Sequence, residues 1–379
     1  MGTVKLFHLS DLHLGRKLSD YPLAEEQEHI LNEILKAVDE EMPDGVIIAG
    51  DVYDKPVPSE DAVNMFDGFL TGLAERGVKT FVVSGNHDSA ERVAFGGRLM
   101  ERAGVFISPA YDGNIEGIAL TDDINVYLMP FIREYAVRAA FPEREIRSLD
   151  DAVRTVVENI KLDRSKVNIL AAHQFVTGKA DGSDVERGAD QFKAVGGVDN
   201  IDVNIFGGFD YVALGHIHKP QRVGRDTVRY CGSPLKYSFD EADQRKAVVV
   251  AEIDGRDIKT REIPLTPLRD LKVFEGTFGE IMALDGCDDY VKVILTEAGT
   301  ADVFSALSKK FPHIAETEFR LPGTVAAGSR KGIKEIGAKT PLDIIKEFFE
   351  QQNGAVMNGE QEDICEELLE EILNDASGR

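Results

Sequence analysis

Cysteine is scarce in this sequence, with three residues in 379: Cys231, Cys287 and Cys365. Their odd number and wide spacing argue against a disulfide framework and fit a reducing compartment. No apolar run approaches the length of a membrane span, and the N-terminus has neither the charged region nor the apolar segment of a secretory signal. We therefore expect a cytoplasmic protein that does not cross a membrane.

Basic residues are also few, since 43 lysines and arginines stand against 67 aspartates and glutamates and the net charge is −24. This balance argues against a protein that coats nucleic acid through a general basic surface. Nucleic-acid binding is compatible with it if divalent cations supply local positive charge, if basic residues cluster, or if a partner subunit carries much of the affinity.

Short apolar, β-branched runs recur through the first two thirds of the chain and predict strands: VKLFHLS, GVIIAG, KTFVVSG, INVYLMPF, VNILAAH and YVALGH. Helix-period stretches lie between several of them, at residues 24–38 and 60–76. This alternation predicts an α/β layered fold. From about Arg222 the pattern becomes antiparallel, with a turn at Asp254-Gly255, and predicts a hairpin layer that completes the domain.

The chain is predicted to divide into four segments, namely a main domain (1–266), a smaller α+β domain (267–322), a linker (323–339) and two C-terminal helices (340–379). The smaller domain contains strand YVKVILTE, helix DVFSALSKKF and strand AETEFRL. The linker is rich in glycine, alanine, serine and lysine. Thr340-Pro341 resembles a capped helix start, and an apolar stripe marks the last helix.

Polar residues follow five of the predicted strands at the point where each strand ends. They are Asp11 and His13, Asp51 and Asp54, Asn86, His87 and Asp88, His173, and His216 and His218. Because the carboxyl ends of neighbouring strands in an open α/β sheet meet at one crevice, these side chains are expected to form one pocket.

Imidazole and carboxylate ligands favour two divalent ions such as Mn, Fe or Zn, and no cysteine lies in any motif. Asp51 is the candidate bridge between two ions, which would activate a hydroxide and neutralise phosphate charge. The implied reaction is phosphoester hydrolysis without a covalent intermediate. His87 is the candidate hydrogen-bond or proton donor, with Asp54 or Asp88 orienting its ring.

A single histidine or aspartate at a strand end is more often an ordinary loop residue than a ligand. Five compatible motifs at five strand ends are much harder to assign to coincidence. His8 within the first strand, His29 within a helical pattern and His313 in the smaller domain are instead interpreted as structural or surface residues.

The motifs D-x-H, G-D-x-x-D, G-N-H-D, H and G-H-x-H, in this order, resemble the calcineurin-like metallophosphoesterase superfamily over residues 1–260. The stretches HLSDLHLGR, IAGDVYDKPVPS, VVSGNHDS, LAAHQFV, LGHIHKPQ and YCGSPLKYSF are similar to the SbcD family of bacterial nuclease subunits. The resemblance implies a four-layer sandwich in which two central β-sheets are flanked by helices.

It also implies two metal ions, usually manganese, with His87 assisting catalysis. The first ion would be held by Asp11, His13, Asp51 and His218, and the second by Asp51, Asn86, His173 and His216. Some relatives carry histidine where this chain has Asp54, which favours an orienting role for Asp54 over a metal contact.

The resemblance further implies a nuclease that cuts single strands internally and duplex ends in the 3′-to-5′ direction with an SbcC-type ATPase, in DNA repair and recombination. The smaller domain would shape DNA access, and the C-terminal helices would dock on the ATPase, although they could equally pack on their own domain. A homodimer would form through helices near 59–76 and 89–103, where the apolar pattern fits core burial equally well.

DNA contacts are expected from basic residues in or near the motif loops, although surface lysines and arginines are usually only solvated. The candidates are Arg16, Lys17, Arg92 and Lys219, together with Lys179, Arg187 and Arg222. Two alternatives to a nuclease stay open. One is a phosphatase or phosphodiesterase that uses the same dinuclear core on a small substrate, and the other is a metal-free scaffold that only binds partners.

Overall fold

The computed structural model describes residues 2–179, 182, 184–186, 200–297 and 301–320, with single positions between 346 and 365. The predicted linker, nearly all of the two C-terminal helices, and Arg187 lie outside these residues. The chain divides into two units, each described by itself. The first comprises Met1–Val273, Cys287–Lys292 and Phe311–Glu316, and the second comprises Phe274–Gly286, Val293–Lys310 and Thr317–Arg379.

One six-stranded sheet forms the first half of the main unit. Its order is β16 (Asp257–Pro264), β15 (Ala247–Asp254), β1 (Val4–Leu9), β4 (Gly45–Ala49), β5 (Lys79–Val83) and β6 (Val105–Ile107). Strands β1, β4, β5 and β6 are parallel, whereas β15 and β16 are antiparallel additions at one edge. This edge contains the hairpin expected around Asp254-Gly255, whereas residues 225–230, expected in the same layer, form a strand of the second sheet.

A second six-stranded sheet has the same mixed plan. Its order is β13 (Gln221–Val223), β14 (Arg225–Tyr230), β12 (Tyr211–Gly215), β9 (Val167–His173), β8 (Ile124–Met129) and β7 (Gly117–Thr121). The four inner strands are parallel, and both edge strands run antiparallel to their neighbours. Two short pairs, β2 (Lys17–Leu18) with β3 (Tyr21–Pro22) and β10 (Val176–Thr177) with β11 (Ile201–Asp202), lie outside both sheets.

The sheets bury a common core because alternate side chains on a strand point to opposite faces. On β4, Ile47 and Ala49 belong to the core between the sheets, whereas Val46 and Ile48 belong to the core beneath the helices. The second sheet repeats this division on β9, where Ile169 packs inward and Leu170 outward. Strands buried on both faces explain why these runs are continuously apolar.

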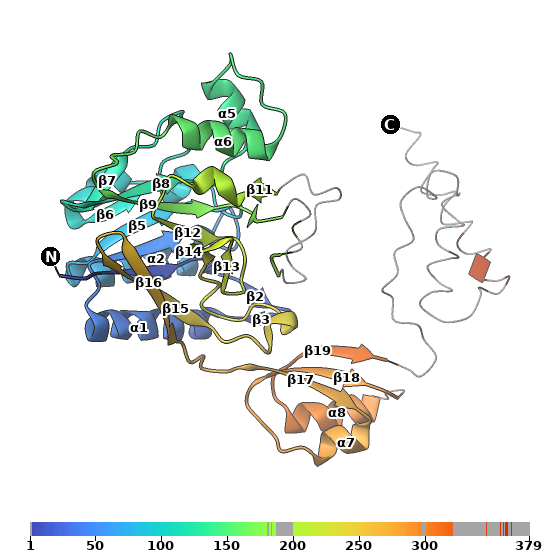
Figure 1. Ribbon diagram of the computed structural model, residues 1–379. Helices are drawn as coiled ribbons and strands as arrows, with labels where there is room; N and C mark the ends of the chain where they lie inside the picture. The colour runs from blue at the N-terminus through green and yellow to red at the C-terminus, as the bar shows by residue number, and fades with distance from the viewer. Residues whose placement is uncertain are drawn as a thin grey trace. The chain divides into compact units, whose positions relative to one another are not determined.

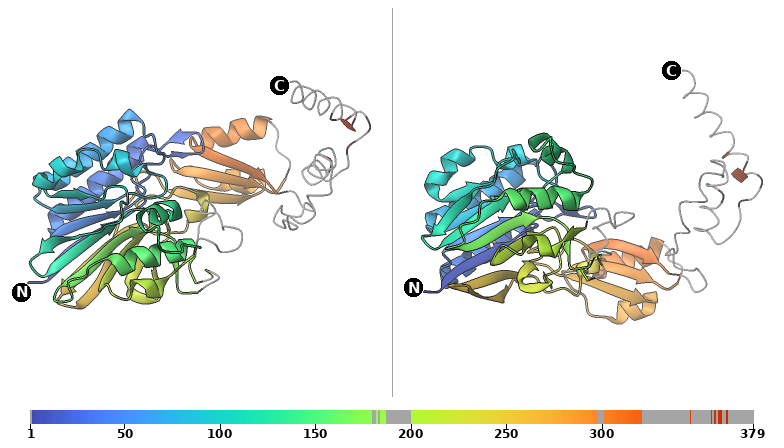
Figure 2. Two further views of the ribbon diagram at one scale, coloured as in Figure 1. Left: turned by 90° about the horizontal axis from the view of Figure 1, so that it is seen from above. Right: turned by 45° about the horizontal axis from the view of Figure 1, so that its top comes forward.

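Helices cover both outer faces, and Figure 2 shows the resulting four layers. On the first sheet these are α1 (Ala24–Glu41) and α2 (Glu60–Glu75), followed in sequence by α3 (Ala90–Val93), α4 (Gly97–Met100) and η1 (Glu101–Ala103). The second sheet carries α5 (Glu134–Ala140), α6 (Leu149–Asn159) and η2 (Val203–Phe206). Ser59 and Ser148 cap α2 and α6 by accepting backbone amide bonds. The predicted four-layer sandwich is confirmed.

A smaller three-stranded sheet follows the main sheets along the chain (Figure 1). Its strands are β17 (Leu271–Gly276), β18 (Tyr290–Leu295) and β19 (Ile314–Phe319), accompanied by α7 (Phe278–Ala283) and α8 (Ala301–Lys310). Strands β18 and β19 and helix α8 match the sequence expectation, but β17 and α7 were not anticipated. The limits 267–322 of the smaller domain stay a prediction. Across the described part of the chain, no helix has the length and apolarity needed to span a membrane.

Candidate metal centre

All five polar motifs lie where their strands end, three on the first sheet and two on the second. Four of their residues have a left-handed backbone: Asp11 (φ 53°), His13 (φ 43°), Asp51 (φ 49°) and His216 (φ 99°). Such conformations are costly away from glycine, and they persist where surrounding contacts impose them. The amide of Asp11 donates to the Gly50 carbonyl and that of His13 to the Asp51 carbonyl, both at 2.9 Å, which ties the first two loops together.

Glycine lets the strand ends approach closely. A Cβ on Gly215 would overlap the backbone carbonyl of Ala49 and lie 2.7 Å from His173 Nδ1. A Cβ on Gly85 would overlap the Asp51 amide nitrogen and a carboxylate oxygen, and would lie 2.7 Å from Asp51 Cγ. Both glycines therefore leave the space that the neighbouring site residues occupy.

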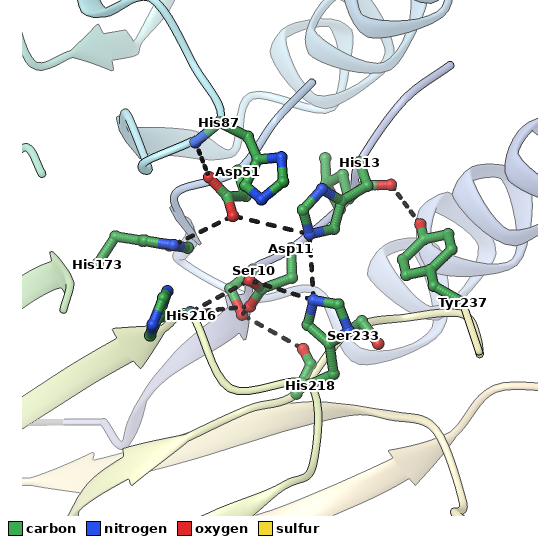
Figure 3. Close-up of polar contacts among 12 residues, drawn as sticks. Ser10, Asp11, His13, Asp51, His87, His173, His216, His218, Ser233 and Tyr237 are labelled. Carbon is green, nitrogen blue, oxygen red and sulfur yellow. Dashed lines mark hydrogen bonds and ion pairs between the residues drawn. The ribbon is translucent and has the colours of Figure 1, made fainter. Parts of the chain in front are cut away.

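The first donor group consists of Asp11, His13 and His218, whose ligand atoms lie within 4.8 Å of one another. His13 Nε2 lies 3.1 Å from His218 Nε2, and His218 Nε2 lies 3.9 Å from Asp11 Oδ1. Figure 3 shows the two rings and the carboxylate pointing toward one another. Two imidazole nitrogens that face a carboxylate match the ligand preferences of a divalent transition metal.

The second donor group consists of Asp51, Asn86, His173 and His216. His173 Nε2 lies 3.2 Å from Asp51 Oδ2 and 3.1 Å from Asn86 Oδ1, and His216 Nδ1 lies 3.0 Å from the same amide oxygen. Asp51 also faces the first group, because its Oδ2 is 3.7 Å from His13 Nε2. One carboxylate oxygen therefore lies between the two groups, where a bridging ligand would be needed.

Hydrogen bonds behind the rings fix which nitrogen faces the centre. His173 Nδ1 donates to the Ala49 carbonyl at 2.8 Å, because a carbonyl oxygen can only accept, and this leaves Nε2 toward Asp51. His218 Nδ1 lies 3.0 Å from Glu241 Oε1. Glu241 was missed from the sequence, because no spacing pattern connects it with His218.

Two carboxylates, Asp11 and Asp51, are almost completely buried at this centre. Their ion pairs are with histidine rings, His218 for Asp11 and His13 and His173 for Asp51. Burial raises the pKa of Asp11. For Asp51 burial acts in the same direction, but the rings of His173, His13 and His87 together outweigh it and the pKa is lowered. Burial lowers the pKa of His173, whereas Asp51 raises it, with a net rise to about 9.

This chemistry fits bound cations. Burying two carboxylates is costly unless positive charge compensates them, and divalent ions among these nitrogen and oxygen donors would provide it. The facing rings of His13 and His218 add a second indication, because their Nε2 atoms lie 3.1 Å apart and a cation held by both nitrogens would account for that approach.

His87 lies at the edge of the centre and is partly exposed. Its backbone amide donates to Asp51 Oδ1 at 2.9 Å, and its ring Nδ1 donates to the Asp54 backbone carbonyl at 2.9 Å. The orienting partner is therefore a main-chain carbonyl, where an aspartate side chain was expected. The Asp54 carboxylate instead faces Arg16 Nη1 at 3.4 Å and His13.

Asp88 shapes the loop rather than contacting the His87 ring. Its carboxylate accepts backbone amides from Val52 at 3.1 Å, from Tyr53 at 2.9 Å and from Gly85 at 2.9 Å. These bonds join the ends of β4 and β5, which carry Asp51 and Asn86.

The candidate DNA-contacting residues have different surroundings. The Arg16 guanidinium lies over the Tyr237 ring at 5.3 Å and beside Asp54, and the Lys219 ammonium pairs with Glu186. Lys17 and Arg92 are exposed. Proximity to the centre is thus established for Arg16, through its contact with Asp54.

A family model, the calcineurin-like phosphoesterases, matches residues 4–220. Together with the sandwich and the two donor groups, this match defines the protein as a metallophosphoesterase, a hydrolase that acts on ester bonds.

Two curated relatives narrow the class. The SbcD subunit of the SbcCD nuclease from Staphylococcus epidermidis is 30% identical over 98% of this chain and 99% of its own length. The protein of the same name from Staphylococcus saprophyticus is 32% identical over 73% of this chain and 72% of its own. Among solved structures, a dimetal phosphatase from Danio rerio is 13% identical, with a TM-score of 0.40, over 70% of this chain and 100% of its own. The chain belongs to the SbcD family of nuclease subunits.

Proposed function

We propose that this protein is a metal-dependent DNA nuclease that hydrolyses phosphodiester bonds with two manganese ions. The observation that carries this proposal is the position of Asp51 Oδ2 between His13 Nε2 at 3.7 Å and His173 Nε2 at 3.2 Å, one from each donor group. The names of the relatives support a nucleic-acid substrate, since both are nuclease subunits, and the sequence resemblance implies that it is DNA.

The residues assigned to each ion follow the two donor groups. The first ion would be held by Asp11, His13, Asp51 and His218, and the second by Asp51, Asn86, His173 and His216. Bound there, the two metal ions would activate a water nucleophile at neutral pH and supply positive charge for the phosphate oxygens. Manganese suits this mixture of imidazole, carboxylate and amide ligands.

His87 would act on the leaving oxygen. Its Nδ1 proton is engaged by the Asp54 carbonyl, so the ring can donate from Nε2 only when it is protonated on both nitrogens. The protonated ring is then a general acid whose direction is held by the main chain. Asp54, on this assignment, keeps Arg16 at the rim of the centre.

The substrate activities are those expected from the sequence, namely internal cleavage of single strands and 3′-to-5′ degradation of duplex ends with an SbcC-type ATPase. The relatives are named as subunits of SbcCD, which supports such a partner. Residues 340–379 are proposed to dock on the ATPase, and residues 267–322 to shape DNA access. Phosphate contacts by Arg16, Lys17, Arg92 and Lys219 would position DNA without reading its bases.

A homodimer is proposed through helices α2, α3 and α4. Phe95 is 83% exposed and Leu99 is 75% exposed, next to α3 and on α4. Exposed residues of this size favour an interface over core burial. Phe95→Glu should shift sedimentation at micromolar concentration from dimer to monomer, whereas a monomeric wild type would refute the dimer.

The function is tested by incubating the protein with manganese and single-stranded circular DNA, beside a small phosphodiester. Circular DNA has no ends, so its conversion to linear fragments demonstrates internal cleavage of the backbone. Turnover of the small phosphodiester without cleavage of DNA would instead support a small-substrate phosphodiesterase. A wild-type protein that binds no metal would support the scaffold alternative.

A further inference from the structure

A buried ion pair lies directly behind the metal ligand His218. Glu241 ends the short helix η3 (Phe239–Glu241), and Lys246 immediately precedes β15. Glu241 is 1% exposed and Lys246 is 5% exposed. Replacing such a buried pair with apolar residues is often neutral or stabilising, so the pair is not explained by stability alone.

Both oxygens of Glu241 have donors. Oε1 accepts from His218 Nδ1 at 3.0 Å, and Oε2 accepts from Lys246 Nζ at 2.5 Å. The proton on Nδ1 leaves Nε2 without one, and Nε2 is the nitrogen that faces His13 Nε2 at 3.1 Å. Glu241 therefore sets both the tautomer and the direction of the His218 ring.

Lys246 holds the same loop from its backbone side. Its ammonium donates to the His218 carbonyl at 2.9 Å, to Ser233 Oγ at 2.9 Å and to Gln244 Oε1 at 2.8 Å, in addition to Glu241. The ammonium thus contacts the His218 main chain and the carboxylate that directs its ring.

The second donor group is supported differently. His173 Nδ1 donates to the Ala49 main-chain carbonyl, a contact that no single side-chain substitution removes. Loss of Glu241 should consequently affect the first donor group and leave the second in place.

We propose that Glu241 is a positioning residue that sets the affinity of the first metal site by holding the His218 ring with Nε2 toward the ion, and that Lys246 compensates its buried charge. The proposal rests on the metal pair proposed above. It does not depend on DNA as the substrate.

In Glu241→Gln, the two donors His218 Nδ1 and Lys246 Nζ face a side chain with only one acceptor oxygen. The single amide oxygen can accept either from His218 Nδ1 or from Lys246, and the amide NH₂ then faces the other donor. If the amide turns its NH₂ toward the ring, Nδ1 must accept, the proton moves to Nε2, and the ligand nitrogen is blocked. Lys246→Met removes the competing donor, so the double variant Glu241→Gln/Lys246→Met lets the amide oxygen return to His218.

A second double variant isolates the acceptor. Glu241→Leu/Lys246→Met also removes both buried charges, but it offers nothing to His218 Nδ1. The two double variants share Lys246→Met and a neutral residue at 241, and they differ in the hydrogen-bond acceptor. Glu252→Gln serves as the control, because Glu252 lies away from the centre, where its Oε1 pairs with Arg261 Nε at 2.9 Å.

The experiment is equilibrium dialysis of metal-free protein against a manganese series, with bound metal measured by mass spectrometry and the fold checked by circular dichroism. Wild type and Glu252→Gln should bind two ions per chain. Glu241→Gln should keep one ion at wild-type affinity and bind the other about 10- to 100-fold more weakly. Glu241→Gln/Lys246→Met should recover most of that loss, and Glu241→Leu/Lys246→Met should not.

Equal affinity for both ions in Glu241→Gln, equal weakening of both, or identical binding by the two double variants would overturn the proposal. If Glu241→Gln alone does not fold, the two uncharged double variants still decide it. A wild-type protein that binds two ions but cuts no DNA would refute the nuclease assignment and leave this inference standing. A wild type that binds fewer than two ions would refute the metal pair on which this inference rests.

Discussion

Gly85→Ala tests whether close packing of the strand ends sets the geometry of the centre. The new Cβ would lie 2.7 Å from Asp51 Cγ, whereas ordinary contact begins at 3.4 Å. The carboxyl carbon must therefore move by at least about 0.7 Å, and the overlapped oxygen by more. Because Asp51 lies between both donor groups, a displacement near 1 Å should cost about 100-fold in kcat/KM, or about 2.7 kcal/mol of transition-state stabilisation.

The assay is hydrolysis of bis(p-nitrophenyl) phosphate with manganese, with metal content and circular dichroism measured on the same samples. Gly68→Ala is the matched control, because Gly68 lies exposed on α2 with no atom within 4 Å of its would-be Cβ. It should leave kcat/KM unchanged and raise stability by up to about 1 kcal/mol. Wild-type turnover and metal content in Gly85→Ala would refute the packing argument.

Three further predictions concern stability. Asp88→Asn faces three backbone amides with one oxygen and should lower the free energy of unfolding by about 1–3 kcal/mol in urea titrations; an unchanged midpoint would contradict this. Arg261 and Lys5 lower the pKa of Glu41. The Glu41 carboxylate should therefore contribute about 1 kcal/mol at most to the free energy of unfolding. This contribution should be complete above the ordinary pKa near 4.5 and should be lost as pH falls below it. The melting temperatures of wild type and Glu41→Gln should accordingly differ at pH 7 and converge at low pH. Chelation should lower the melting temperature and manganese should restore it, because manganese at 100 times Kd adds about 2.7 kcal/mol per site to the free energy of unfolding. A similar response in Asp51→Asn would contradict the ligand assignment.

Much of the fold could be predicted because its strands carry a strong local signal. Runs such as GVIIAG are buried on both faces and end abruptly in polar residues, so strand and motif are visible together. The nearness of Asp11 and Asp51 follows from the rule that parallel strands end at one edge. His173 ends a strand of the second sheet, and its nearness to Asp51 depends on how the two sheets pack. The two curated relatives and the family model confirm the resemblance read from these motifs.

Other features could not be predicted because their partners carry no sequence signal. The His87 ring is oriented by a backbone carbonyl, which every residue possesses, so the side chain of Asp54 was the natural but less accurate choice. Glu241 lies 23 residues from His218 in an irregular segment, and only the tertiary structure brings them to 3.0 Å. Strand β17 and helix α7 each contain six residues, too few for a clear period.

The most direct test of the central claim is manganese-dependent cleavage of single-stranded and duplex DNA by wild type beside His87→Ala, with metal content measured on both. The proposed function predicts that wild type cuts DNA, and that His87→Ala retains both ions but cuts at least about 100-fold more slowly. A wild type that leaves DNA intact while hydrolysing a small phosphodiester would contradict the nuclease assignment, and wild-type cleavage by His87→Ala would contradict the role of His87.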